Sequence, residues 1–255
     1  MSVSILHKID ITKIKYSLFV KNLFTGEVIC YDENKVIPSA SLIKIPIMVV
    51  IFKQVNEKIL KLEEKIKIKQ KDKVPFSILS LLDTDLFTLK DLITLMIIQS
   101  DNTATNILID MVGMDNVNTF IKSIGLQNTV LQRKMMDYEA RKNGLENYTT
   151  AKDISILLEM MYRGILIDIK YSNLMLTILK AQLDNSMMRL FIPDTVEIAH
   201  KTGELEGIDH DVGIVFLNKN DYIFSMLTYN AESNNLARKT IGEVSKNIYD
   251  YFMKK

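Results

Sequence analysis

Strand-like segments lie at both ends of this chain, and helix-like segments fill the middle. Near the start, Tyr16 to Leu23 and Glu27 to Tyr31 flank a Thr25-Gly26 turn, a pattern that predicts a β-hairpin. Near the end, Asp211 to Leu217 and Tyr222 to Tyr229 flank a second polar turn. We expect the four strands to share one antiparallel sheet, which would bring the two ends of the chain together.

The remaining segments have the spacing of helices. Asn234 to Met253 places apolar residues three to five positions apart, which predicts a helix packed on the sheet. Thr88 to Asp91 has the pattern of a capping box that opens an apolar helix. Further helices are expected at 103–112, 117–123 and 150–162. The predicted fold class is α+β, an antiparallel sheet flanked by helices with an inserted all-helical region.

This organisation favours one domain that takes in all of residues 1–255. We assign about 1–38 and 190–255 to the sheet-and-helix region, and about 39–189 to the all-helical region. A chain of this length can bury a sizeable core in one domain.

The charge balance excludes several classes of partner. The 32 Lys and Arg residues oppose 31 Asp and Glu residues, for a net charge of +1. This gives no basic footprint for a nucleic acid or a membrane surface. The longest apolar run, Ile45 to Phe52, is far shorter than the roughly 20 residues of a membrane span. We expect a small-molecule substrate, no nucleic acid partner and no membrane span. The sequence leaves the oligomeric state open, and we favour a monomer.

The sequence offers no thiol pair and no metal-ligand spacing. Cys30 is the only cysteine, so one chain can build neither a disulfide nor a Cys-based zinc site, and we interpret it as a small apolar residue on a strand. His7, His200 and His210 lie far apart in the sequence. We therefore expect no metal and no cofactor. The first ten residues lack the apolar run of a signal peptide, so either the protein stays in the cytoplasm or a leader has been removed.

Ser41 and Lys44 form an S-x-x-K pattern at the predicted start of an apolar helix. Residues three apart share one helix face, so we expect the Lys44 ammonium within reach of the Ser41 hydroxyl. Free N–H groups and the positive dipole end there favour negative charge near the serine oxygen. A serine becomes a nucleophile when a base takes its proton, and a lysine with a lowered pKa can be that base. The alternative is a helix cap followed by an ordinary lysine.

Two further triplets suit the same chemistry. The Ser-Asp-Asn triplet at 100–102 joins two predicted helices. It is either a capped turn or a turn that projects a hydroxyl and a carboxamide into a cleft. The Lys-Thr-Gly triplet at 201–203 lies on a predicted strand. One interpretation is an exposed lysine on a sheet edge followed by a turn glycine. The other is a binding site in which the lysine, the threonine hydroxyl and the open glycine backbone face a bound carboxylate or acyl group.

The motifs S-x-x-K, S-D-N and K-T-G occur in the order that marks class A β-lactamases and penicillin-binding proteins. Three further segments are also similar to that family: the amino-acid sequence from Met96 to Asn106, the hairpin before Pro38 and the strands after Lys201. The chain resembles the class A β-lactamase family over nearly its whole length. The resemblance implies a β-lactamase/transpeptidase-like fold.

The resemblance also implies catalytic roles. Ser41 would be the nucleophile that attacks a lactam or peptide carbonyl, and Lys44 would take part in its deprotonation. Ser100 would relay a proton to the leaving nitrogen. Lys201 would raise the local positive potential and attract a carboxylate-bearing substrate.

Neighbouring groups would bind the substrate by the same resemblance. The backbone N–H groups of Ser41 and Glu204 would form the oxyanion hole. Asn102 and Thr202 would hold the substrate's amide and carboxylate, and Gly203 would leave the backbone open to approach.

The stretch from Leu131 to Thr150 departs from the family. Class A enzymes carry a Glu there that activates the deacylating water, with an Asn four residues on. Glu139 and Asn143 reproduce that spacing, and Asp137 is a second candidate, whereas a solvated surface carboxylate is the alternative for Glu139. A shortened loop without the Glu would instead resemble penicillin-binding peptidase-like relatives, which acylate readily and deacylate lactams poorly.

A second departure concerns the substrate carboxylate. The strand after Lys201 lacks the arginine that many class A enzymes use to hold it, and His210 stands at about that place. The imidazole is either a weaker, pH-dependent substitute or a structural histidine. Glu204 stands where the family commonly has a small residue, and it either tightens the cleft or repels anionic substrates.

The leading functional hypothesis is a serine hydrolase of class A β-lactamase type, which hydrolyses β-lactam amide bonds through an acyl-enzyme. The closest alternative is a D-Ala-D-Ala carboxypeptidase or transpeptidase-like penicillin-binding protein, or an esterase, with slow deacylation. An alternative from another class is a sensor that a β-lactam acylates once.

Overall fold

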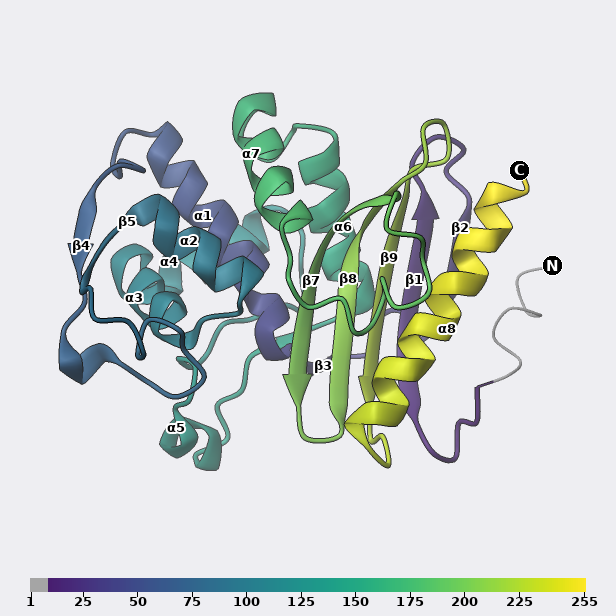
Figure 1. Ribbon diagram of the computed structural model, residues 1–255, viewed down its shortest axis with the longest axis horizontal. Helices are drawn as coiled ribbons and strands as arrows, with labels where there is room; N and C mark the ends of the chain where they lie inside the picture. The colour runs from purple at the N-terminus through teal and green to yellow at the C-terminus, as the bar shows by residue number, and fades with distance from the viewer. Residues whose placement is uncertain (1–8) are drawn as a thin grey trace.

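The computed structural model describes residues 9–255 (Figure 1). His7 lies outside this described part, and so does most of the ten-residue segment that bears on the signal peptide. Five strands form one antiparallel sheet in the order β2-β1-β9-β8-β7. Their bounds are β1 (Lys15–Asn22), β2 (Val28–Tyr31), β7 (Glu197–Leu205), β8 (Ile208–Phe216) and β9 (Tyr222–Tyr229). The predicted sheet, built from both ends of the chain, is confirmed.

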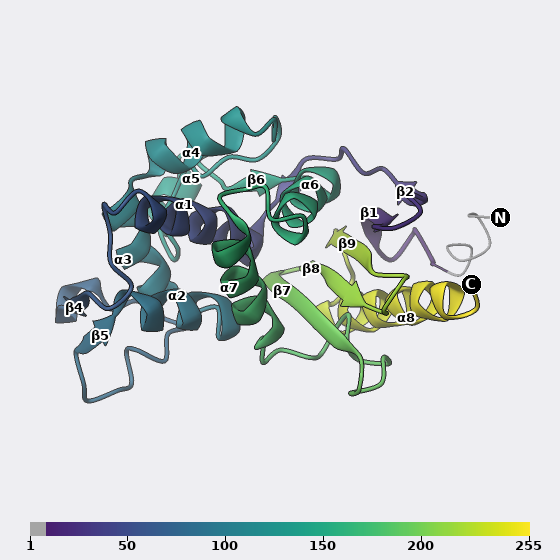
Figure 2. The same cartoon turned by 90° about the horizontal axis from the view of Figure 1, so that it is seen from above.

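Helices cover both faces of this sheet (Figure 2). On one face α8 (Asn234–Met253) packs against β8 and β9, and on the other α6 (Ala151–Tyr162) packs against β1, β8 and β9. The side chain of Ser233 caps α8 by accepting from the Leu236 N–H, and Thr150 caps α6 by accepting from the Asp153 N–H. The predicted helices at these places are confirmed, and the one expected from Thr150 starts a residue later because Thr150 is its cap.

A helical region lies beside the sheet (Figure 1). Its helices are α1 (Lys44–Asn56), α2 (Leu89–Ile98), α3 (Asn102–Val112), α4 (Met114–Ser123), α5 (Tyr138–Lys142) and α7 (Ile169–Lys180), with two 3-10 turns, η1 (Ala40–Ile43) and η2 (Gln70–Asp72). The predicted capping box is present, because Thr88 accepts from the Asp91 N–H while the Asp91 carboxylate accepts from the Thr88 N–H.

The helical region also holds short strands, which differs from the expectation of an all-helical segment at 39–189. The strand β3 (Ile37–Pro38) pairs with β6 (Tyr148–Thr149), and β4 (Lys65–Lys67) pairs with β5 (Leu86–Thr88). These pairs give hydrogen-bond partners to backbone groups of the connecting segments, which would otherwise lack them. The β3-β6 pair also joins the segment just before Ser41 to the loop that ends at α6.

The helix α1 is the centre of the helical region. Its residues from Lys44 to Phe52 are all buried, and α2, α3, α4 and α7 pack around it. An apolar residue at almost every position suits a helix that is surrounded on all sides. Lys44 is the exception, and a buried ammonium needs hydrogen-bond acceptors to remain there.

Two further features bear on the expected partners. Within residues 9–255, no helix is long and apolar enough to cross a membrane. In the same part of the chain, no three His, Cys, Asp or Glu side chains are grouped so that they could hold a metal ion. Cys30 lies on the strand β2, where it is exposed.

Candidate active site

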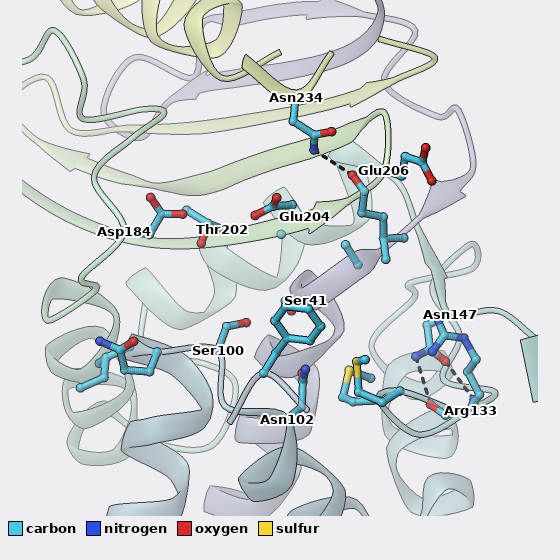
Figure 3. Close-up of a pocket in the computed structure, with 18 of the residues that line it drawn as sticks. Ser41, Ser100, Asn102, Arg133, Asn147, Asp184, Thr202, Glu204, Glu206 and Asn234 are labelled. Carbon is cyan, nitrogen blue, oxygen red and sulfur yellow. Dashed lines mark hydrogen bonds between the residues drawn. The ribbon is translucent and has the colours of Figure 1, made fainter. Parts of the chain in front are cut away.

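A pocket of about 810 Å³ lies between the edge strand β7 and the helical region (Figure 3). Ser41 of η1 and the turn residues Ser100 and Asn102 line one side. Thr202 and Glu204 of β7 line the opposite side. The three sequence motifs, which are far apart along the chain, therefore meet at one cavity.

Ser41 lies in the short 3-10 helix η1, just before α1 begins at Lys44. The first N–H groups of a helix have no acceptor one turn back, so the Ser41 N–H is available for a ligand. Pro46 falls in the first turn of α1, where its missing N–H costs nothing. Ala40, directly before Ser41, has a left-handed backbone with φ of 46°. The serine thus lies at a tightly constrained turn into a buried helix.

Lys44 is bound to the turn at 100–102. Its Nζ donates to the Ser100 carbonyl oxygen at 2.6 Å, to Ser100 Oγ at 2.9 Å and to Asn102 Oδ1 at 3.0 Å. Burial lowers the pKa of Lys44 well below its usual value, the charge of Lys201 lowers it further, and Asp101 acts in the opposite direction.

The expected direct contact of Lys44 with Ser41 is not a hydrogen bond in this geometry. Among the described residues, none joins Lys44 Nζ to Ser41 Oγ. The three ammonium protons already have three acceptors on the neighbouring turn, so none is left over for the serine.

Ser100 connects the two lysines. Its Oγ accepts from Lys44 at 2.9 Å and from Lys201 at 3.1 Å, which leaves its own proton to be donated into the pocket. The backbone of Ser100 is left-handed, with φ of 54°. Asp101 fixes the turn, because its carboxylate accepts from the Ala104 N–H at the start of α3 and from the Ser77 hydroxyl.

Lys201 is fully buried on β7. Its Nζ donates to Ser100 Oγ and, at 2.7 Å, to the Thr202 carbonyl oxygen. Burial lowers the pKa of Lys201 to about 8, against the opposing charges of Asp211 and Asp184. At neutral pH most of this lysine is still protonated.

Gly203 allows β7 to lie against the serine turn. A Cβ atom at this position would come within 3.2 Å of Ala40 Cβ and 3.2 Å of the Ser41 nitrogen. Both separations are tighter than ordinary van der Waals contacts, so a side chain at 203 would push the turn away from the strand. The glycine is required by space, and the β7 backbone lies directly beside the Ser41 N–H.

Glu139 does not reach the pocket. It lies on the short helix α5 with an exposed side chain, and it is not among the residues that line the cavity. Asp137 caps α5 by accepting from the Ala140 N–H, and Asn143 ends that helix. Because this capped turn of helix directs residue 139 to solvent, Glu139 is the surface carboxylate given above as the alternative.

The loop around α5 contributes other groups to the pocket. The residues of this segment that line it are Arg133, Met135, Met136, Tyr138, Arg141 and Asn147. A buried ion pair holds the loop, since Arg133 Nη2 lies 2.7 Å from Glu146 Oε1. The amide oxygen of Asn147 accepts from the backbone N–H groups of Gln132 and Arg133.

His210 is also absent from the pocket lining. The ring is fully buried, and burial lowers the pKa of His210 to about 4, so it is neutral at neutral pH. Its Nε2 lies 2.9 Å from the Pro38 carbonyl oxygen, and its Nδ1 lies 2.7 Å from the Asp209 carbonyl oxygen and 3.2 Å from the Thr228 nitrogen. His210 therefore joins β8 and β9 to the segment before Ser41, and it does not hold a substrate carboxylate.

Several pocket residues carry no motif that sequence reasoning could have used. Phe76 is 80% exposed at the pocket, on a left-handed backbone with φ of 55°. Asp184, Glu206 and Asn234 line the β7 side. Burial alone would raise the pKa of Asp184, but hydrogen bonds from Ser186 lower it overall.

A turn that carries Ser41, two buried lysines and a bridging serine lie between an antiparallel sheet and a helical region, an arrangement that fits a serine β-lactamase-type fold. The chain belongs to the β-lactamase enzyme family, whose model matches residues 5–252. This confirms the predicted resemblance to the class A β-lactamases and the predicted α+β fold class.

Solved structures and a sequence relative agree with this. A β-lactamase from Sphaerobacter thermophilus DSM 20745 has a TM-score of 0.91 and 26% identity, over 100% of this chain and 97% of that chain. The protein PBP-A has a TM-score of 0.91 and 26% identity, over 100% of this chain and 96% of its own. The β-lactamase VEB-1 of Pseudomonas aeruginosa is 21% identical over 237 residues, which are 86% of this chain and 79% of VEB-1.

Proposed function

We propose that this protein is a penicillin-recognising serine enzyme in which Ser41 opens β-lactams to an acyl-enzyme that is hydrolysed slowly. The observation that carries the proposal is the hydrogen-bonded series Lys44, Ser100 and Lys201 beside Ser41. It provides a lysine with a lowered pKa, a hydroxyl able to pass on a proton and a second cation.

Acylation follows from these groups. Burial lowers the pKa of Lys44, and its neutral form gives up one of the three donated hydrogen bonds and gains a free lone pair. This neutral Lys44 takes the proton of Ser41 as the serine oxygen attacks the lactam carbonyl carbon. The carbon–nitrogen bond then breaks, and Ser100 gives its proton to the leaving nitrogen while it takes one from the Lys44 ammonium. Lys44 returns to its neutral form, and the acyl group stays on Ser41.

The carbonyl oxygen carries negative charge during the attack. We assign its stabilisation to the backbone N–H groups of Ser41 and Glu204, an assignment favoured by the close approach of Gly203 to the Ser41 nitrogen. A donor of this kind is typically worth about 10²–10³ in rate. Asn102 and Thr202 line the pocket on either side, where they would contact the substrate amide and the group next to the scissile bond.

Slow hydrolysis is favoured over rapid turnover because of the loop around α5. The segment of this loop that lines the pocket contributes arginine, methionine, tyrosine and asparagine side chains, and its carboxylates at 137, 139 and 146 are not in the lining. Water activation on that side would therefore lack a carboxylate base. A variant of PBP-A has been solved as an acyl-enzyme complex with penicillin G, which supports acylation in this fold.

The experiment follows the acyl-enzyme directly. The protein is mixed with a chromogenic cephalosporin, and intact mass is measured at seconds and at hours alongside absorbance. We expect one adduct per chain that persists, loss of the adduct in Ser41→Ala, and unchanged kinetics in Glu139→Gln. Rapid turnover without an adduct would support a fast β-lactamase instead, and no reaction in the wild type would contradict the proposal.

A further inference from the structure

The arginines that line the pocket are already paired with a carboxylate. Arg133 Nη2 lies 2.7 Å from Glu146 Oε1, and Arg141 Nε lies 3.3 Å from Glu146 Oε2. Guanidinium groups are the usual partners of a carboxylate because their fork matches its two oxygens. Arg133 has no nitrogen left for a substrate, since its Nε and Nη2 contact Glu146 and its Nη1 donates to the Lys134 carbonyl oxygen. Arg141 contacts Glu146 through Nε alone.

A third guanidinium, Arg238 of α8, lies behind the β7 wall. Its Nη2 donates to Glu204 Oε2, its Nε donates to Asp209 Oδ1 at 3.2 Å, and its Nη1 donates to Ser186 Oγ at 3.3 Å. All three nitrogen atoms of the group thus have partners within the protein. Glu204 is the partner on the pocket side, since it lines the cavity and its side chain is 58% exposed.

Glu204 also places a negative charge beside Thr202. Alternate residues of a strand share one face, so Thr202 and Glu204 point to the same side of β7. Asp184 lies next to Thr202 on that wall, as Figure 3 shows, and both residues line the pocket. The hydroxyl expected to hold a substrate carboxylate therefore lies between two carboxylates.

We propose that Glu204 determines specificity by withholding Arg238 from the substrate, so that the pocket favours acyl donors that are uncharged where a penicillin carries its carboxylate. The preferred class is an ester or amide at that position. The inference rests on the proposed acylation of Ser41. Only the side chain of Glu204 is involved, because its backbone N–H is kept in every variant.

Benzylpenicillin and its methyl ester are the probes, and the acylation efficiency of each is measured by intact mass over time. The wild type should acylate the ester at least as efficiently as the free acid. Glu204→Gln keeps the size of the side chain but removes its charge and with it the ion pair to Arg238 Nη2, so it should raise the acid-to-ester ratio about tenfold. Adding Arg238→Gln to Glu204→Gln should abolish that gain.

Glu206→Gln is the matched control, since it removes the same charge from the same wall and leaves Arg238 paired with Glu204. A ratio that rises as much in this variant would overturn the role of Arg238. An unchanged ratio in Glu204→Gln would overturn the inference while adducts with both probes upheld the proposed function. No adduct with either probe in any variant would overturn both.

Discussion

Gly203→Ala tests the close contact between β7 and the turn that carries Ser41. The added Cβ would lie 3.2 Å from the Ser41 nitrogen, 3.2 Å from Ala40 Cβ and 3.4 Å from the Ser39 carbonyl oxygen. Carbon atoms in good contact are about 3.5–4.0 Å apart, so the turn would have to move by a few tenths of an ångström. Ala40 already has a left-handed backbone, which leaves the turn little freedom to move without further strain.

Two magnitudes follow from this geometry. Overpacking of a well-packed site costs about 1–3 kcal/mol of the free energy of unfolding. In the proposed mechanism the same methyl group would also displace the Ser41 N–H from the developing oxyanion, and loss of one such donor lowers the rate about 10²–10³-fold. We therefore expect a moderate loss of stability and a much larger loss of acylation.

The assay is the stopped-flow acylation rate with a chromogenic cephalosporin, paired with thermal unfolding. Gly242→Ala on α8 is the matched control, because its Cβ would lie 3.1 Å from Leu190 Cβ and 3.1 Å from the Met187 carbonyl oxygen, away from the pocket lining. It should retain the acylation rate. The reasoning is refuted if Gly203→Ala acylates within threefold of the wild type, or if Gly242→Ala loses as much activity.

Two further predictions concern charge. Burial lowers the pKa of Lys201 to about 8, so this lysine loses its proton as the pH rises through 8. The acylation rate should therefore fall about tenfold per pH unit above that point. A stopped-flow acylation rate that stays constant up to about pH 9.5 would contradict this. Glu146→Gln leaves the buried Arg133 without its partner and should lower the free energy of unfolding by about 3–5 kcal/mol in urea denaturation. Glu57→Gln, which removes the exposed partner of Lys53, should cost under about 1 kcal/mol.

The elements with local signals could be predicted from the sequence. The helix at 234–253 has a regular apolar stripe and a serine cap, and its bounds agree with the structure. The two hairpins carry alternating patterns and turns, and their strands pair in one sheet. The short strands at 65–67 and 86–88 were not predicted, because each is only three residues long and residues 68–85 separate them, so no tight turn marks them as a hairpin.

The motif residues were predictable, but their partners were not. Ser41, Lys44 and Ser100 are fixed by spacing within short segments, whereas the bonds of Lys44 depend on how α1 docks against the turn after α2. For Glu139 the spacing matched the family, but the sequence did not reveal that a capped helical turn would direct it to solvent. The burial of His210 is likewise a property of the packed sheet and not of the residues beside it in the sequence.

The pairing of charges, rather than their number, sets the chemistry of this pocket. Lys44 and Lys201 both bond to Ser100 Oγ and are buried together, so each ammonium raises the cost of charging the other. Lys201 retains its proton more easily because Asp211 and Asp184 both oppose the effect of burial on its pKa. For Lys44 only Asp101 opposes the effect of burial, and the charge of Lys201 adds to that effect. The environment therefore favours the protonated form more strongly for Lys201 than for Lys44, as the proposed mechanism requires. The net charge of +1 for the whole chain does not reveal this difference between the two lysines. The difference arises only because the fold brings Lys44 and Lys201, which are far apart in the sequence, to the hydroxyl of Ser100.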